Sequence, residues 1–385
     1  MHVLFVNSGI LGHQAVAALL QDAVSRDPAV VSRHVDLSAS LSVSERVVRR
    51  LLCARVFGAS GFGRSNLDLA RWRQELHAGL LARRRIRATN HEWPVDVLHF
   101  HTQATAYCSL RRMRRTPSIV SIDITQPLAS LEVPSSIGRL TYRPNVWHDG
   151  VVFRHAAAIT STSEWAAHDL AAHYPACAGK VRVMTYPVRL DLADPSWPAA
   201  RAARVAAAPG APVRVLFMGG DFPRKGGPEL LEAWRVAGLT GRAELTLATG
   251  WPIESDSLPP GVRVARNVRP YSPAWIDLWR ETDLFVMPTR GEAFGMVFQE
   301  AAAAGVPAIA PAINAVPELI EDGVTGILIP PGNPAALADA LRVLVTSGDR
   351  RRVMGEAART RIEHRGDPAL YARRLTALIH DVAHR

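Results

Sequence analysis

Two carboxylates bracket an apolar segment in the second half of the chain. Glu292 and Glu300 stand near the two ends of GEAFGMVFQE, residues 291–300. The glycines favour a loop followed by a helix that begins near Phe294 or Gly295, so Glu292 precedes the helix. The step from Gly295 to Glu300 then covers about one and a half turns. A carboxylate at Glu300, beside Phe298 and a run of alanines, is costly unless a partner or a ligand satisfies it.

A purely structural interpretation of these two acids is also open. Glu292 can stabilise the positive end of the helix dipole, and Glu300 can be a solvated helix residue. This interpretation explains Glu292 well and explains Glu300 poorly, because the sequence around Glu300 has little other polarity.

A second segment combines glycines with two cations. MGGDFPRKGG, residues 218–227, follows an apolar run and brings Gly220, Arg224 and Lys225 to the start of a predicted helix. Close backbone approach, helix N–H groups and fixed positive charge suit a diphosphate. The spacing is neither a P-loop nor GxGxxG. Only Lys180 and Lys225 are lysines among 45 basic residues, which favours a specific role over an ordinary glycine turn with solvated charges.

The elements that must position these segments form a repeated strand and helix pattern. Strands are predicted at 2–8, 96–102, 118–123, 157–163 and 180–186, and again at 213–220, 243–250, 262–268, 283–289, 307–312 and 326–331. Continuous apolar strands between helices are typical of parallel sheets. The Pro- and Ala-rich break at 187–212 predicts a linker. We therefore expect an α/β protein with two doubly wound domains that face a central cleft, with ligands beyond the carboxyl ends of the strands.

Composition narrows the class of protein. A hydrophobic content of 48% with 21% charged residues is typical of a globular protein. Cys53, Cys108 and Cys177 are widely spaced, so neither a disulfide framework nor structural zinc is expected, and a cytoplasmic location is the default. The first residues read as a strand and not as a signal peptide, and no membrane-spanning helix is expected.

The net charge of +10 is unevenly distributed. Residues 41–90 contain eleven arginines and three acids, which gives this window a net charge of +8. One interpretation is a solvated helix face. The other is a peripheral contact with an anionic membrane, on its cytoplasmic side, or with an acidic acceptor. Nucleic acid is not expected as a partner, because the window has one Trp and no aromatic platform interleaved with the arginines.

Several linked motifs resemble one enzyme family. The E-x7-E spacing of GEAFGMVFQEAAAAGVPAIA, the following AVPELIEDGVTGILIPPGNPAALADAL and the turn MGGDFPRKGGPELLEAW are similar to the retaining glycosyltransferases of family 4, which have the GT-B fold. The resemblance is strong over about 213–345 and looser before it. It implies an acceptor-binding domain at 1–190, a linker at 191–212, a donor-binding domain at 213–365 and a C-terminal helix at 366–385 that packs back on the first domain.

The resemblance also implies roles for residues of the second domain. Arg224 and Lys225 would neutralise the diphosphate of a nucleotide-sugar donor, and Glu300 would accept hydrogen bonds from the ribose. Glu292 would hold the sugar, and the backbone near Val268 would meet the base. The backbone N–H groups that would hold the β-phosphate with Glu292 belong to Ala293, Phe294, Gly295, Met296 and Val297.

In the first domain the resemblance is less complete. Gly9 and Gly12 stand where the family has its first glycine loop, able to approach the donor phosphate. Asp123 stands where the family often has a histidine, so it is expected to orient the sugar or the acceptor hydroxyl or to act as a base; a turn cap is the alternative. His101, with His99 on the same strand face, is expected to line the site or to pack.

The activity that follows is the transfer of a hexosyl-type sugar from a nucleotide-diphosphate sugar to a hydroxyl acceptor, with retention of configuration. No cofactor and no metal are expected, since Arg and Lys neutralise the diphosphate and the chain has no DxD motif. The alternative is a catalytically silent protein of the same fold that binds a nucleotide sugar or an anionic lipid.

Overall fold

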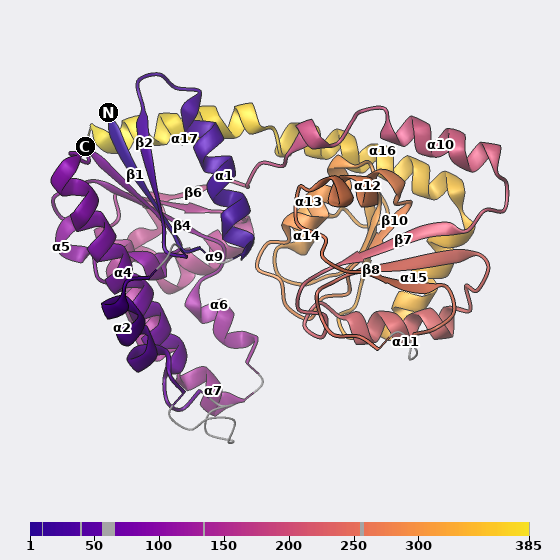
Figure 1. Ribbon diagram of the computed structural model, residues 1–385, viewed down its shortest axis with the longest axis horizontal. Coiled ribbons are helices and arrows are strands. Elements are labelled where there is room, and N and C mark those ends of the chain that lie inside the picture. The colour runs from indigo at the N-terminus through magenta and orange to yellow at the C-terminus, as the bar shows by residue number, and fades with distance from the viewer. Residues whose placement is uncertain (10, 39–40, 56–65, 134, 255–257, 385) are drawn as a thin grey trace. The chain divides into compact units, whose positions relative to one another are not determined.

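The structure is a computed structural model that describes residues 1–9, 11–38, 41–55, 66–133, 135–254 and 258–384 (Figure 1). The chain divides into two compact units. Unit 1 comprises Met1–Tyr186 and Ala369–Arg385, and unit 2 comprises Pro187–Pro368. The chain therefore passes from one unit to the other twice, after Tyr186 and after Pro368.

Unit 1 is built on a six-stranded parallel sheet of order β2-β1-β3-β4-β5-β6. Its strands are β1 His2–Asn7, β2 Val31–Asp36, β3 Val97–His101, β4 Ser118–Ile122, β5 Ala158–Ser161 and β6 Val181–Val183. Its helices are α1 Leu11–Ser25, α2 Val43–Cys53, α4 Ala70–Glu92, α5 Leu110–Met113, α6 Gln126–Leu131, α7 Ser136–Leu140, α8 Arg143–His155, α9 Glu164–His173 and α17 Pro368–Ala383, with 3-10 turns η1 Gln103–Ala106 and η2 Pro175–Lys180. The C-terminal helix α17, in yellow, lies with the indigo and violet elements of this unit (Figure 1).

Unit 2 has a second six-stranded parallel sheet, of order β12-β11-β10-β7-β8-β9. The strands are β7 Val213–Met218, β8 Ala243–Ala248, β9 Val262–Ala265, β10 Leu284–Val286, β11 Ala308–Pro311 and β12 Gly326–Ile329. The helices are α10 Trp197–Ala207, α11 Gly227–Ala237, α12 Pro273–Glu281, α13 Met296–Ala303, α14 Val316–Leu319, α15 Pro334–Thr346 and α16 Gly348–Arg365, with the 3-10 turn η3 Leu190–Leu192.

Both strand orders reverse direction once, and the reversal determines where a ligand can bind. In unit 1 the reversal lies between β1 and β3, and in unit 2 it lies between β7 and β10. Neighbouring strands at such a point send their following loops to opposite sides of the sheet, which opens a crevice at their carboxyl ends. The segments after β7 and β10 are the two that the sequence singled out, 218–227 and 291–300.

Each unit has its own apolar core, and the prediction of two doubly wound α/β domains is confirmed. The core of each sheet contains strand residues that are fully buried, such as Phe100 in unit 1 and Phe285 in unit 2. Strand β2 was missed in the sequence, because the edge strand VSRHVD alternates polar and apolar residues and lacks the continuous apolar pattern of the inner strands. No described helix combines the length and the apolar character that a bilayer span requires.

The predicted linker at 191–212 contains a helix that belongs to unit 2. Trp197 at the start of α10 is buried in the apolar core of this unit. Arg201 donates from its guanidinium to the backbone oxygens of Ala304 and Gly305, each at 3.1 Å. The alanines that made this segment look like a flexible connection are also strong helix formers, and one aromatic and one arginine anchor the helix.

Candidate active site

A lysine and a glutamate from two different loops meet at the carboxyl ends of β7 and β10. The Lys225 ammonium and the Glu292 carboxylate form an ion pair, and each side chain is only 14% exposed. A pair that is this well shielded from water interacts more strongly than a surface pair. The structure thus brings together one residue from each of the two segments that sequence reasoning selected.

The backbone of the first loop fits closely against the second. Gly226 has φ +78°, and a Cβ at this position would collide with the Pro288 carbonyl, so the left-handed conformation and the tight contact both require glycine. Arg224 donates from Nη1 to the backbone oxygen of Gly291 at 2.7 Å and from Nε to Asp221 at 3.1 Å. Half of the Arg224 side chain is exposed, so part of its guanidinium is accessible to a ligand. Gly220 borders open space, with no heavy atom near the position of a Cβ.

Helix α13 begins where the sequence predicted. Met296 is its first residue and Gly295, at φ +96°, is the residue before it. The N–H groups of the first turn have no acceptor inside the helix and give this end a positive character. Phe294 is buried against the loop, whereas Ala293, Met296 and Val297 keep some exposed surface.

Glu300 lies one turn into α13, and its carboxyl group is buried. Part of the residue remains accessible, but its carboxyl group is surrounded by protein atoms, and this burial raises its pKa to about 8. A hydrogen bond with Tyr271 works in the opposite direction. Tyr271 in turn lies under the Arg189 guanidinium, 5.8 Å from the ring centroid. Val268, three residues before Tyr271, is half-buried and packs against the core of unit 2.

In unit 1, Asp123 follows β4 and ends a chain of hydrogen bonds. Tyr186 donates its hydroxyl to Asp123 Oδ1 at 2.9 Å, and His101 Nε2 lies 2.8 Å from the same hydroxyl oxygen. Because the tyrosine proton goes to Asp123, the network assigns the histidine proton to Nε2, which donates to the tyrosine. Burial, followed by the charge of Asp123, holds the pKa of Tyr186 well above its ordinary value, so it stays a donor.

A second layer of polar side chains holds the loop that carries Asp123. Gln103, just after β3, donates from Nε2 to the backbone oxygen of Ile124 at 3.1 Å and to Asp149 at 3.3 Å. Asp149 is fully buried and also accepts from the Tyr107 hydroxyl at 2.8 Å. Burial, with the nearby charge of Glu75, raises the pKa of Asp149 well above its usual range. Asp123 is therefore placed by a rigid, hydrogen-bonded support.

The remaining predicted residues of unit 1 separate into loop and packing positions. Gly9 follows β1 at φ +74°, where a Cβ would collide with Asp36 and Ser38. Gly12 lies within α1, not in the loop before it. His99 is fully buried, 3.0 Å from the Ser121 hydroxyl, and burial lowers its pKa to about 3. His99 is thus a neutral packing residue, whereas His101 belongs to the Asp123 chain.

Sequence reasoning missed Tyr186, Gln103 and the buried carboxylate Asp149. The first two occur inside segments that had been selected, HFHTQ and VRVMTYPVRLD, but a lone tyrosine or glutamine gives no signal by itself. The position of Gln103 becomes meaningful when parallel pairing sets β3 beside β4, and that of Tyr186 when its hydroxyl reaches Asp123. Among the described residues, no three His, Cys, Asp or Glu side chains gather as metal ligands would.

Comparison with known proteins agrees with this arrangement. Residues 212–347 match the family model described as glycosyl transferases group 1. Unit 2 contains a group 1 glycosyltransferase domain. The D-inositol 3-phosphate glycosyltransferase of Streptomyces scabiei is 29% identical to this chain, over 96% of the chain and 82% of the relative. Its namesake from Streptomyces avermitilis is also 29% identical, over 90% of the chain and 73% of the relative.

Solved structures share the fold of the whole chain. Sucrose-phosphate synthase from Thermosynechococcus elongatus superposes with a TM-score of 0.73 at 17% identity and covers 99% of both chains. Anabaena HepE, solved in complex with UDP-glucose, gives a TM-score of 0.67 at 17% identity, over 99% of this chain and 100% of that one. Unit 2, which contains the group 1 domain, and unit 1 each have a Rossmann-like sheet. The two together match the GT-B glycosyltransferase architecture.

Proposed function

We propose that this protein is a retaining, metal-independent glycosyltransferase that uses a nucleotide-diphosphate sugar. The observation that carries the proposal is the pairing of Lys225 with Glu292 at the start of α13, inside the group 1 domain. When the donor binds, the ion pair breaks and each side chain contacts a different part of the donor. The ammonium moves to the diphosphate, and the carboxylate accepts a hydrogen bond from a sugar hydroxyl.

The surrounding groups extend this site along the donor. Arg224 supplies a second cation for the diphosphate, and the first-turn N–H groups of α13 face the β-phosphate. Glu300 accepts from the ribose hydroxyls, which favours its ionised form. The backbone beside Val268 meets the base. HepE, a protein of similar fold, has been solved with UDP and with UDP-glucose, which favours a uridine nucleotide as the first donor to test.

The proposed reaction makes one bond and breaks one at the anomeric carbon. The acceptor oxygen attacks on the face that the leaving diphosphate vacates, and the acceptor proton passes to a diphosphate oxygen. Charge develops on the diphosphate, where Lys225, Arg224 and the helix N–H groups stabilise it. No protein nucleophile takes part.

Asp123 is the residue of unit 1 that we assign to the reacting sugar or the acceptor hydroxyl. It comes after a strand at the carboxyl edge of the sheet, and Tyr186 fixes one of its oxygens. The acceptor class to test first is a phosphorylated cyclitol, because the relatives at 29% identity are named for D-inositol 3-phosphate. The three cysteines are free, and we propose a cytoplasmic location, where nucleotide sugars would be available.

Donor hydrolysis tests the assignment without knowledge of the acceptor. The protein is incubated with UDP-, GDP- and dTDP-sugars, and release of the nucleoside diphosphate is measured. One donor is expected to be consumed slowly by the parent and not by Glu292→Ala or Lys225→Ala. Normal consumption in both variants would overturn the site, whereas binding of a donor without any consumption would favour the catalytically silent alternative.

Two further measurements test the finer parts of the proposal. With D-inositol 3-phosphate or another accepted hydroxyl compound, proton NMR of the product should show the anomeric configuration of the donor; an inverted product would contradict retention. Turnover should be equal with and without EDTA, because Lys225 and Arg224 neutralise the diphosphate. Loss of turnover in EDTA, restored by a divalent cation, would contradict metal independence.

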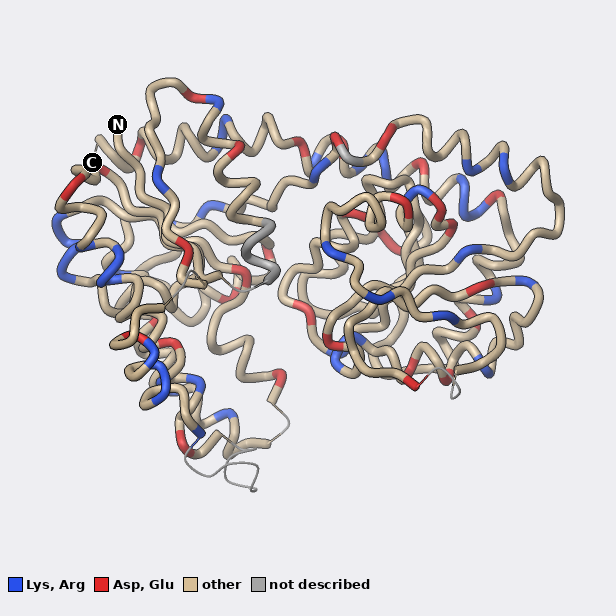
Figure 2. Tube along the Cα trace, in the orientation of Figure 1, with Lys and Arg blue, Asp and Glu red and all other residues tan. Residues whose placement is uncertain are grey.

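We also propose a peripheral membrane contact through α2. Its residues Val43, Val47 and Leu51 follow a four-residue spacing and are 68%, 53% and 71% exposed, so they form one apolar stripe. Arginines of the same helix lie beside this stripe, and Figure 2 shows the basic residues of α2 and α4 in blue. Arg85 is engaged with Glu45 at 3.3 Å, so only part of the window of 41–90 is available, and Arg64 lies outside the described residues.

Liposome flotation tests this contact. Binding to vesicles that contain anionic lipid should weaken with salt and be lost in Val47→Asp. Val353→Asp is the matched control, since Val353 on α16 is also 53% exposed. Flotation that is equal for the two variants, or absent in the parent, would leave the arginine window as a solvated face.

A further inference from the structure

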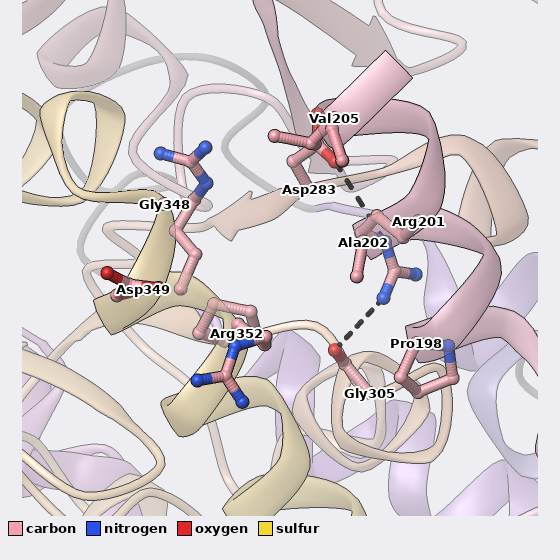
Figure 3. Close-up of a pocket in the computed structure, with 12 residues that line it drawn as sticks. Pro198, Arg201, Ala202, Val205, Asp283, Gly305, Gly348, Asp349 and Arg352 are labelled. Carbon is pink, nitrogen blue, oxygen red and sulfur yellow. Dashed lines mark hydrogen bonds and ion pairs between the residues drawn. The ribbon is translucent and has the colours of Figure 1, made fainter. Parts of the chain in front are cut away.

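Unit 2 contains a cavity at the amino end of β10, away from the proposed donor site. The cavity has a volume of about 340 Å³ and lies between α10 and the first turn of α16 (Figure 3). Asp283, which immediately precedes β10, and Gly305, which follows α13, complete its wall. It therefore opens at the amino end of β10, whereas Glu292 follows the carboxyl end of the same strand.

An adjoining cavity of about 400 Å³ continues the first one. The two share Val205, Asp283, Gly348 and Arg351. Basic residues outnumber acidic ones around the combined space. The arginines are 201, 204, 242, 351 and 352, and the acids are Asp283 and Asp349. This imbalance gives the cavity a positive potential that would attract an anion.

The one buried carboxylate of the cavity is already occupied. Asp283 has a side chain that is 3% exposed, and it pairs with Arg204. It also accepts from the backbone N–H of Arg214 at 2.9 Å. It also forms a longer ion pair, at 4.0 Å, with Arg201 Nε, and this distance is too long for a hydrogen bond. Asp283 therefore does not satisfy all the cations around it.

Arg201 lines this cavity with a largely buried guanidinium, whose Nε forms an ion pair with Asp283. Its side chain is 10% exposed, and its two terminal nitrogens are fixed on the Gly305 and Ala304 carbonyls. Within the described part of the chain, its Nε has no hydrogen-bond partner. Burial lowers the pKa of Arg201 to about 10, and repulsion from Arg204 adds to this effect against the attraction of Asp283. A buried cation with an unmade hydrogen bond costs stability unless an anion satisfies it.

The start of α16 adds backbone donors to the same wall. Gly348 and Asp349 are the first residues of this 18-residue helix, and both line the cavity. Their N–H groups have no acceptor within the helix. Arg351 uses Nη1 on the Leu344 and Val345 carbonyls, which leaves its other guanidinium donors for a ligand. Arginine forks and helix N–H groups together match the oxygens of a phosphate.

The other side of the cavity is apolar. Pro198, Ala202, Val205 and Pro307 form that side, and they suit a carbon skeleton better than a second charge. We propose that this cavity binds a small phosphomonoester, with the phosphate on the arginines and the first turn of α16 and the organic part against the apolar wall. The site is separate from the donor site and does not depend on the proposed transferase activity.

Calorimetric titration at low salt tests this proposal in the Lys225→Ala background, which removes a phosphate-binding cation of the donor site. Inorganic phosphate and glucose 1-phosphate are the probes. Both should bind, and each of Arg352→Ala and Arg351→Gln should weaken binding by about tenfold, the effect of one charge-assisted hydrogen bond. The matched control is Arg350→Ala, an exposed arginine of the same helix turn, which should bind as its parent does.

Three results of the titration would contradict the proposal. Absence of binding in the Lys225→Ala background would overturn the proposal, as would affinities that Arg352→Ala and Arg351→Gln leave unchanged. Binding of inorganic phosphate with exclusion of glucose 1-phosphate would overturn the assignment to a phosphomonoester. Arg352 pairs with Glu356 on the exposed surface of α16, so its substitution tests binding without a large cost to folding.

Discussion

At the ends of β7 and β10 in unit 2, opposite charges meet on glycine turns. At the ends of β3 and β4 in unit 1, by contrast, a chain of hydrogen bonds between buried side chains leads to one carboxylate. Lys225 and Glu292 pair with each other, and each side chain could bind a ligand in place of its partner. The chain from His101 through Tyr186 to Asp123 fixes one carboxylate in place. The first arrangement suits a highly charged donor, and the second suits the orientation of a neutral hydroxyl.

The comparison predicts that loss of charge in unit 2 has the largest effect. Lys225→Ala should reduce kcat/KM for the donor by about 100- to 1,000-fold, because a fixed cation stabilises the departing diphosphate. The only other lysine provides the control. Lys180 donates to the backbone oxygens of Arg154 and Ala156 at 2.9 and 2.8 Å, so Lys180→Ala should lower thermal stability and leave kcat/KM near that of the parent. Steady-state kinetics on both variants would contradict the account if their activities were alike.

Asp123→Asn should have the next largest effect. The amide keeps the shape of the side chain but loses the charge that orients the reacting hydroxyl, and transfer to the acceptor should fall by about 100-fold. Donor affinity should stay unchanged, since the groups proposed to bind the diphosphate belong to unit 2. Parallel measurements of transfer and of nucleoside diphosphate binding separate these effects. A variant that loses donor affinity but keeps its rate of transfer would place Asp123 outside the reaction.

Tyr186→Phe should cost about tenfold, the value of one hydrogen bond to a charged group. The phenol donates to the Asp123 carboxylate, so its removal disfavours the ionised carboxylate. As the pH is lowered, the variant should therefore lose activity at a higher pH than the parent does. A pH–rate profile with an unshifted acidic limb would show that Tyr186 is only a packing residue.

Glu300→Gln should change activity least, because glutamine can still accept a hydrogen bond from a ribose hydroxyl, and its main effect should appear in stability. Burial raises the pKa of Glu300 to about 8, so the folded protein binds a proton more readily than the unfolded chain. The parent therefore loses stability as the pH rises from about 4.5, the ordinary glutamate value, to about 8, and the neutral variant does not. Denaturant unfolding should show the variant ahead by at most a few kcal/mol above pH 8 and equal to the parent near pH 4. Equal stability at both pH values would contradict a buried carboxylate.

The sequence carried more information about unit 2 than about unit 1. Some features of unit 2 can be recognised in the sequence without a structure. They are glycines that adopt a left-handed conformation, such as Gly226 and Gly295, and a lysine in a turn that resembles a phosphate-binding loop. Such glycines also predicted a helix start near Phe294 or Gly295, and α13 begins at Met296. The support of Asp123 depends on Tyr186 and Gln103, which lie 63 and 20 positions away from it. Only strand pairing and burial, which are properties of the folded sheet, bring such residues together.

The cavity between α10 and α16 could not be predicted from the sequence for the same reason. Arg201, Asp283 and Arg351 are far apart in the chain and belong to a segment predicted as a linker, to the start of a strand and to a helix. Each would be ordinary in isolation. Their common cavity arises because α10 packs on unit 2, and the alanine-rich sequence of α10 gave no indication of that contact.

Titration of UDP, GDP and dTDP into the parent and into Lys225→Ala tests the central claim most directly, because it measures the diphosphate site without chemistry. The account predicts that at least one of the three binds the parent and binds the variant about 100-fold more weakly, with the Lys180→Ala control unchanged. Equal affinity of the parent and Lys225→Ala for every nucleotide that binds, or no binding to the parent, would contradict the assignment of the donor site to the loops after β7 and β10.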